Sequence, residues 1–383
     1  MQRLFKIVCR GSRLSLAQAD IVKKKLLAFD PTMELEIVIK ETQGDLNQSV
    51  PLQELEGKDF FTKDIQDFLL TGQADFAVHS LKDVSGDFFN GNHFALIERD
   101  DPRDVAVFNN DVFDKIRESE KLKVGTSSPR RAIMATDFLL KALPRVNEQE
   151  VNVEAFAIRG NVDTRLQKLT SSEYDGIILA CAGLNRLLRA DQGKYVERLL
   201  KDKVIMILPL LHCPPAPGQG AIVAETSPSN VDAIKILQAI NDKPLAQAVV
   251  MERKVAQRYG SGCHQQFGAV HINTGDTQFI YVAGKDREGK IFEENYSSDG
   301  AVMNRKQNPV IVNSNHPLFA QQNIQVIANQ YESIDATKRI WVAKTETWFE
   351  LAKMGFWIEG SLEGLGLKFN EFTMMSPLLK VCL

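Results

Sequence analysis

A short apolar run that ends in four polar side chains carries the most suggestive chemistry in the sequence. Residues 76–78 are too few for three helical turns, so they are predicted to form a buried strand. The run leads into His79, Ser80, Lys82 and Asp83. Ligands of open α/β sheets bind just beyond the carboxyl ends of strands. An aspartate that nearby cations keep ionised can stabilise a developing positive charge or accept a proton. A surface salt bridge on a loop would use the same Lys–Asp pair, and these residues alone leave both interpretations open.

Three predicted strand-to-helix turns combine a glycine or small residue, a helix cap and arginines. The turns and their N-caps are residues 10–13 with Ser12, residues 125–131 with Ser128, and residues 159–165 with Asn161. A helix N-terminus favours anions, whereas arginine at that end disfavours the helix. A bound anion would offset this cost, and guanidinium groups match carboxylates in bidentate fashion. A single turn is more simply a solvated cap, but three in one chain favour a small ligand with several carboxylates. The sequence has no GxxxxGK[ST] or GxGxxG motif that would indicate a nucleotide.

Cys263 lies in a glycine-flanked segment, residues 259–268. A thiolate adds readily to a carbon electrophile. A lone cysteine is nevertheless more often buried and inert, and the neighbouring residues indicate no reaction partner. The cysteines are odd in number and lack a CxxC pair, which argues against a disulfide framework and a structural zinc site; they are Cys9, Cys181, Cys213, Cys263 and Cys382. We expect no metal site.

The order of predicted elements indicates how these residues are positioned. Strand and helix patterns alternate through residues 5–8, 14–29, 35–39, 60–70 and 76–78, which favours an α/β domain. The alternation restarts after residues 99–104, which favours a second α/β domain. A Pro/Gly-rich stretch at residues 209–220 marks another boundary. Strand patterns after residue 263 indicate a smaller α+β domain, and the polar segment 41–59 is long enough for a lid.

Composition limits the class of protein. The chain has 383 residues, of which 44% are hydrophobic and 25% are charged, as in ordinary globular proteins of two or three domains. A net charge of -3 provides no basic field for nucleic acid. No apolar run reaches membrane-spanning length, and the N-terminal segment lacks a signal-peptide core. We therefore expect a cytoplasmic protein that binds neither nucleic acid nor membrane.

The chain resembles the porphobilinogen deaminase (hydroxymethylbilane synthase) family from about residue 7 to about residue 270. The shared motifs occur in the family's order; they are Arg10-Gly11-Ser12, Gly57-Lys58-Asp59-Phe60-Phe61, His79-Ser80-Leu81-Lys82-Asp83, residues 99–104, 125–131, 159–166 and 182–187, Pro217-Gly218-Gln219-Gly220, and Gly262-Cys263. The resemblance implies a transferase of haem and porphyrin biosynthesis. Such an enzyme joins four porphobilinogen molecules head to tail, with loss of ammonia, into the linear tetrapyrrole hydroxymethylbilane. It also implies a dipyrromethane cofactor, attached through Cys263, on which the polypyrrole grows.

The resemblance assigns roles to individual residues. Asp83 would contact pyrrole N–H groups, stabilise the azafulvenium-like cation that forms when ammonia departs, and help the later loss of a proton. Lys82 is the second catalytic candidate and would assist in binding carboxylates. Residues that would hold the cofactor are Cys263, Lys82, Asp83, Ser128, Arg130, Arg131 and Arg159. Residues that would bind the acetate and propionate groups of the substrate are Arg10, Ser12, Arg159, Arg165 and Arg186. Lys58 and Phe61 would belong to the lid.

The family fold implies three domains and a monomer. Domain 1 would comprise residues 1–103 with 203–225, domain 2 residues 104–202, and domain 3 residues 226–300. The first two would be α/β domains like those of periplasmic solute-binding proteins around a cleft, and the third a small α+β domain. The resemblance fades beyond about residue 282. Residues 301–383 contain Trp341, Trp348 and Trp357 and further strand and helix patterns, so we expect a folded C-terminal extension that packs on the third domain. The chain departs from the family pattern at Arg13, Asp59, Pro129, Ser261 and Gln266, but none of these positions carries a proposed chemical role.

A non-catalytic receptor for a polycarboxylate is the competing interpretation. It would share the cleft and the anion sites, but it would not need Lys82, Asp83 or Cys263, and it would usually carry a secretion signal. A nucleic-acid binder is disfavoured by the net charge and by the lack of interleaved aromatic and basic residues. Substitution of Asp83 by Asn would distinguish the two. An enzyme would lose nearly all turnover, whereas a receptor would barely change its affinity.

Overall fold

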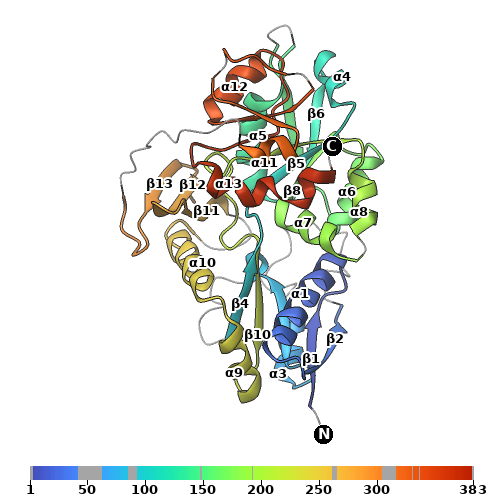
Figure 1. The fold of residues 1–383 in the computed structure, drawn as a ribbon, viewed down its shortest axis with the longest axis vertical. Coiled ribbons are helices and arrows are strands. Elements are labelled where there is room, and N and C mark those ends of the chain that lie inside the picture. Colours follow the sequence, from blue (N-terminus) through green and yellow to red (C-terminus); the bar gives the residue numbers. More distant parts are fainter. Residues whose placement is uncertain are drawn as a thin grey trace.

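Two five-stranded sheets lie one beyond the other along the long axis of the molecule, and smaller units flank the second (Figure 1). The computed structural model describes residues 3–41, 63–84, 93–146, 149–191, 193–260, 265–303, 316–329, 331–335 and 337–381. Lys58, Phe61 and Cys263 lie outside these ranges. Within the described part of the chain, no helix is long and apolar enough to cross a membrane.

The first sheet has the strand order β2-β1-β3-β10-β4. Its strands are β1 (Leu4–Cys9), β2 (Glu34–Ile39), β3 (Phe76–Ser80), β4 (His93–Arg99) and β10 (Ala221–Thr226), and its helices are α1 (Arg13–Phe29), α3 (Lys63–Leu70) and α9 (Val231–Ile240). Side chains alternate between the faces of a strand. Ile7 and Cys9 therefore pack toward α1 and α9, whereas Val8 packs toward α3.

The second sheet repeats this topology in the order β7-β6-β8-β5-β9. Its strands are β5 (Asp104–Asn109), β6 (Lys121–Gly125), β7 (Asn152–Phe156), β8 (Gly176–Ala180) and β9 (Lys203–Ile207). Its helices are α4 (Val112–Arg117), α5 (Pro129–Ala142), α6 (Val162–Thr170), α7 (Cys181–Arg189) and α8 (Gly193–Leu200). In each sheet three parallel strands are followed by an antiparallel fourth strand and by a fifth that is antiparallel to the fourth. The predicted α/β class is confirmed by these sheets.

Two connections join the sheets, one from β4 to β5 and one from β9 to β10. They touch where Asp100 N donates to Gly220 O at 3.0 Å. Gly220 has φ +86°, and a Cβ there would lie 2.4 Å from the carbonyl oxygen of Asp100, so only glycine fits this crossing. The predicted return to domain 1 at residue 203 starts with β9, which pairs with β5. We therefore propose that domain 1 resumes at β10 and includes α9.

The third sheet is an antiparallel meander packed against one long helix. Its strands are β11 (Gln266–Asn273), β12 (Gln278–Lys285) and β13 (Ile291–Tyr296), and the helix is α10 (Lys243–Ala256). Val255 and Ala256 of α10 share a core with Phe267 of β11. In Figure 1 this unit lies beside the junction of the two larger sheets.

The C-terminal extension folds around three short parallel strands. Its elements are α11 (Pro317–Gln321), β14 (Ile324–Ile327), β15 (Arg339–Val342), α12 (Thr345–Lys353), β16 (Gly360–Ser361), α13 (Leu367–Met374) and α14 (Pro377–Val381). The expectation that it packs on the third domain is wrong for most of its length. Its large apolar side chains, Trp341 and Trp348 among them, are buried in the two cores of the second sheet, while Leu365 and Phe369 reach the third sheet.

The extension also holds the two connections between the sheets. Arg103, on the first connection, is buried and donates to Asn370 Oδ1 at 2.6 Å and to Thr373 Oγ1 at 2.7 Å. Glu363 accepts from the Arg103 guanidinium at 3.3 Å and from the backbone N–H of Leu211, on the second connection, at 2.8 Å. The extension therefore binds both connections between the two larger sheets.

Candidate active site

A cavity of about 270 Å³ lies between the two larger sheets, at the carboxyl ends of β1, β3 and β8. Most of the predicted site residues that the structure describes line it: Arg10, Ser12, Lys82, Asp83, Arg131, Arg159, Arg165 and Arg186. Among the described residues, the predicted Ser128 and Arg130 do not line this cavity. The predicted Lys58, Phe61 and Cys263 lie outside the described residues.

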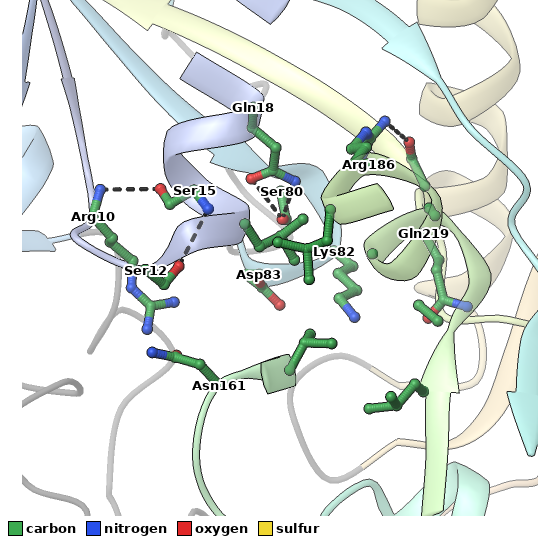
Figure 2. Close-up of a pocket in the computed structure, with 18 of the residues that line it drawn as sticks. Arg10, Ser12, Ser15, Gln18, Ser80, Lys82, Asp83, Asn161, Arg186 and Gln219 are labelled. Atoms are coloured by element: carbon green, nitrogen blue, oxygen red, sulfur yellow. Dashed lines mark hydrogen bonds between the residues drawn. The ribbon is translucent and has the colours of Figure 1, made fainter. Parts of the chain in front are cut away.

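Lys82 and Asp83 extend into the cavity because of the turn that carries them. β3 ends at Ser80 and is followed by a single 3₁₀ turn, η1 (Leu81–Asp83). Residues three apart lie on the same side of a 3₁₀ turn. Leu81 and Val84 are therefore both buried, in a core with Val249 of α10. The intervening Lys82 and Asp83 are exposed, and Figure 2 shows both side chains reaching into the same open space.

The environment of Lys82 lowers the pKa of its ammonium group. Crowding by protein atoms disfavours the ammonium charge, and Arg131 and Arg165 act in the same direction. Asp83 and Asp104 oppose them, and the net effect lowers the pKa of Lys82 to about 8. The amine remains in contact with water inside the cavity, so it can exchange protons near neutral pH.

The first helix start positions Arg10 and Ser12. Ser12 is the N-cap of α1, and its Oγ accepts from Ser15 N at 3.2 Å. Ser15 Oγ in turn accepts from Arg10 N at 3.1 Å. The predicted cap is therefore confirmed. Figure 2 shows the Arg10 side chain at the edge of the cavity, with Asn161 of the second sheet's unit across from it.

The second helix start gives its arginines a partner within the chain. Arg130 Nη2 donates to Asp104 Oδ2 at 2.7 Å, and Arg131 Nη2 donates to Asp104 Oδ1 at 2.7 Å. Burial alone would raise the pKa of Asp104, but the two guanidinium groups outweigh it and hold this pKa well below its usual range. Gln219 Nε2 also donates to Asp104 Oδ1, at 2.8 Å. The sequence predicted that these guanidinium groups bind carboxylates of a ligand, whereas in this structure both bind the carboxylate of Asp104.

The third helix start and helix α7 provide the opposite wall. Asn161 precedes α6 as predicted, although its side chain makes no capping bond. Arg165 Nε donates to Gly160 O at 2.8 Å. Burial, together with Arg131 and Arg159, lowers the pKa of Arg165 to about 10. Arg186 of α7 is 3% exposed and donates to Gly220 O at 2.5 Å.

Positive charge dominates the described lining of the cavity. Six cationic side chains face two carboxylates; the cations are Arg10, Lys82, Arg131, Arg159, Arg165 and Arg186, and the acids are Asp83 and Asp163. Such a cavity favours an anionic ligand, and the arginine forks favour carboxylates. Among the described residues, no group of three or more His, Cys, Asp and Glu side chains could hold a metal ion. The arrangement can bind a polycarboxylate and place one aspartate against it.

Three side chains in or behind the cavity are not among the site residues predicted from the sequence. Gln219 lines the cavity and donates to Asp104, and Gln18 donates to Ser80 Oγ at 2.8 Å, next to the turn that carries Lys82 and Asp83. The GQG motif, with both glycines at positive φ, was the available signal for Gln219. Asp104 is the last residue of the motif 99–104, and the sequence assigns it no role in the site. No pattern in the sequence indicates that it would meet helix α5.

Comparisons with known proteins identify the family of the chain. The family model "porphobilinogen deaminase, dipyromethane cofactor binding domain" matches residues 5–235. The chain belongs to the porphobilinogen deaminase family. Its relatives include the porphobilinogen deaminases of Lachnospira eligens, with 35% identity over 75% of this chain and 91% of that protein, and of Geobacter sp., with 37% identity over 75% and 83%. That of Syntrophus aciditrophicus shares 33% identity over 76% of this chain and 89% of that protein.

Among solved structures, a periplasmic binding protein of Salmonella typhimurium with high arginine specificity matches 66% of this chain and 97% of its own. The identity is 11% and the TM-score 0.34.

The family carries a dipyrromethane cofactor, and the charge of the cavity fits such a group. Each pyrrole bears an acetate and a propionate, so two linked pyrroles present four carboxylates to the six cations of the lining.

Proposed function

We propose that this chain catalyses the stepwise condensation of four porphobilinogen molecules into hydroxymethylbilane. The observation that carries the proposal is the placement of Asp83 beside Lys82 in a cavity lined by arginines, within a chain of the porphobilinogen deaminase family. A receptor needs the arginines only. It has no use for a carboxylate that extends toward a bound polycarboxylate, because like charges repel.

Each condensation breaks one bond and forms another. The C–N bond of the substrate's aminomethyl group breaks, and ammonia leaves with the electron pair after protonation. The methylene carbon then bonds to the free α-carbon of the terminal pyrrole, and that carbon loses its proton. After four condensations, release of the product would break the bond between the methylene carbon of the first substrate and the pyrrole carbon to which it was joined. That pyrrole carbon would take up a proton, and water would add to the methylene carbon with loss of a proton. Four porphobilinogen molecules and one water thus yield one hydroxymethylbilane and four molecules of ammonia.

Asp83 is proposed to act on the positive charge that develops on the substrate as ammonia leaves. Its carboxylate is exposed to the cavity and is carried by a turn whose flanking residues, Leu81 and Val84, are fixed in a core. A fixed carboxylate can accept pyrrole N–H bonds, stabilise the cation and take up the proton that is lost afterwards. Lys82, with its pKa lowered to about 8, is placed to supply a proton or to bind a carboxylate of the substrate.

The remaining cations are proposed to bind acetate and propionate groups. Arg10 with Ser12, and Arg159, Arg165 and Arg186, line opposite walls of the cavity and are suited to the substrate and the growing chain. Arg131 lines the cavity as well, although it also holds Asp104. The structure favours a supporting role for Arg130, which donates to Asp104 and to Pro214 O at 2.7 Å each, and for Ser128, whose side chain accepts from Arg131 N.

The dipyrromethane cofactor is proposed to be attached through Cys263. When bound, it supplies the terminal pyrrole to which the first substrate is joined. The described thiols provide no alternative, because Cys9, Cys181 and Cys213 are buried and burial raises the pKa of each. We further propose that the protein acts in the cytoplasm as a monomer, following the family precedent; size-exclusion chromatography with light scattering tests the oligomeric state.

The test of the proposed function is turnover of porphobilinogen by the wild type and by Asp83→Asn. The exchange of carboxylate for amide keeps the shape of the side chain and removes its charge. We expect wild-type turnover and at least a hundredfold loss of kcat in Asp83→Asn. Asp232→Asn is the matched control, since Asp232 is 65% exposed on α9. A wild type that binds porphobilinogen without consuming it would instead support the receptor.

A further inference from the structure

Arg253 of helix α10 holds the backbone of the turn that carries Lys82 and Asp83. Its Nη2 donates to the carbonyl oxygens of Leu81 and of Val84, the latter at 3.2 Å. These two carbonyl groups bracket the catalytic pair. Arg253 is 8% exposed and is not among the described residues that line the cavity, so it acts on the turn from behind.

A single 3₁₀ turn depends on such support. η1 has only three residues, and the Val84 N–H closes it with one bond to Leu81 O at 3.2 Å. Hydrogen bonds in 3₁₀ structure have poor geometry. The backbone of a turn that is closed by only one such bond can therefore change its conformation easily. A charged donor that reaches both flanking carbonyl groups strengthens the turn and fixes its orientation. The guanidinium stays charged at neutral pH, although burial lowers the pKa of Arg253 to about 10.

The helix that supplies Arg253 is itself tied to the other units. Its neighbour Glu252 is fully buried and accepts from Arg99, from Gly218 N at 2.8 Å and from His271 N at 2.6 Å. These partners belong to the first sheet, to the second connection and to β11. The same helix leads, through residues 257–260, to the segment that contains Cys263. Arg253 thus links the catalytic turn to α10, the helix that precedes the segment with Cys263.

We propose that Arg253 is a positioning residue for the condensation reaction. It fixes the catalytic turn so that Asp83 and Lys82 extend into the cavity in one orientation relative to the third sheet. The proposal rests on the proposed function for its catalytic consequence, whereas its structural part, support of the turn, stands without it.

The test compares Arg253→Met and Arg253→Lys with the matched control Arg258→Met. Arg258 follows the same helix and donates to the carbonyl oxygen of Gly300 at 2.9 Å, away from the turn. Turnover is measured at saturating and limiting porphobilinogen and divided by the fraction of chains that carry the cofactor, which intact-protein mass spectrometry provides. Hydrogen exchange of the peptide that covers residues 76–84 is measured in parallel.

We expect Arg253→Met to lower kcat per loaded chain about 10- to 100-fold, since a misplacement of about 1 Å costs on the order of a hundredfold in rate. KM should change less than threefold. Arg253→Lys, which reaches one carbonyl group only, should recover part of kcat. Exchange in residues 81–84 should be at least tenfold faster in Arg253→Met and unchanged in Arg258→Met.

Three outcomes would overturn the proposal. One is a kcat within threefold of wild type in Arg253→Met, another is an equal loss in Arg258→Met, and the third is unchanged exchange in residues 81–84. If Arg253→Met does not fold, Arg253→Lys decides by the same readouts. A wild type without turnover would refute the proposed function, and the exchange measurement would still decide whether Arg253 supports the turn.

Discussion

Asp104 is the residue whose removal should most disturb the hinge between the two larger sheets. It is the first residue of β5 and is fully buried. Its Oδ1 accepts from Arg131 Nη2 at 2.7 Å, from Arg131 Nε at 3.1 Å and from Gln219 Nε2 at 2.8 Å, and its Oδ2 accepts from Arg130 Nη2 at 2.7 Å. In Asp104→Asn, an amide N–H₂ would replace one acceptor and would face a guanidinium donor.

The expected cost follows from the charges that this substitution leaves behind. Arg130 and Arg131 are 4% and 6% exposed, so both would remain buried without their anion. Breaking a buried ion pair by removing one partner costs about 3–5 kcal/mol. For a unit of this size that loss lowers Tm by on the order of 10 °C.

The pH dependence of the decrease in Tm shows whether the missing charge of Asp104 causes it. Arg130 and Arg131 hold the pKa of Asp104 well below its usual range against the opposing effect of burial. The stabilisation is therefore fully present above the unfolded pKa of about 3.9 and is lost as the pH falls through the folded value. The difference in Tm between wild type and Asp104→Asn should be constant from pH 5 to pH 8 and should narrow from pH 4 to pH 3.

Differential scanning calorimetry of both chains over this pH range measures the difference. Asp114→Asn is the control, because Asp114 pairs with Arg117 on the surface with its side chain 68% exposed. Such exposed pairs contribute about 0–1 kcal/mol. A Tm of Asp104→Asn equal to that of the control would refute the reasoning, and so would a difference that persists unchanged at pH 3.

Two further predictions concern the cavity and the extension. The lowered pKa of Lys82, about 8, predicts that kcat/KM falls as the pH rises through about 8, because the ammonium charge is lost; in Lys82→Arg this limb of the pH profile should move to higher pH. An identical limb in both proteins would exclude Lys82 as its source. Trp348→Ala should destabilise the fold by about 3–5 kcal/mol, because the fully buried Trp348 packs on Phe138 and donates to Ala142 O at 3.0 Å. Urea unfolding measures this loss, and an effect no larger than that of Tyr331→Ala, at a side chain 87% exposed, would contradict the packing of the extension on the second sheet.

Local signals in the sequence predicted the elements that carry the cavity. Ser12, Ser128 and Asn161 each precede the first residue of a helix, and Pro129 occupies the first helical position of α5. These predictions succeed because caps and proline act over a few residues. The end of the predicted strand at residues 76–78 likewise leads into the turn with Lys82 and Asp83, as its apolar and polar residues indicate.

Long-range partners could not be predicted in the same way. The 2.7 Å contacts of Asp104 with Arg130 and Arg131 join residues 26 and 27 positions apart, and those of Arg253 with the turn that carries Lys82 and Asp83 span 172 and 169 positions. Local propensity carries no information about such pairs. The same limit explains the extension, whose tryptophans indicated a fold but not the sheet that would bury them. The boundary at β9 has a different cause, because the resemblance placed residues 203–225 in domain 1 whereas β9 pairs with β5 of the second sheet.

Intact-protein mass spectrometry of the denatured wild type, beside Cys263→Ala, tests the central claim most directly. A porphobilinogen deaminase that carries its cofactor on Cys263 should show the added mass of two linked pyrroles, and Cys263→Ala should show none. An unmodified wild-type mass that persists after incubation with porphobilinogen would contradict the claim and would favour a binding protein built on the same fold.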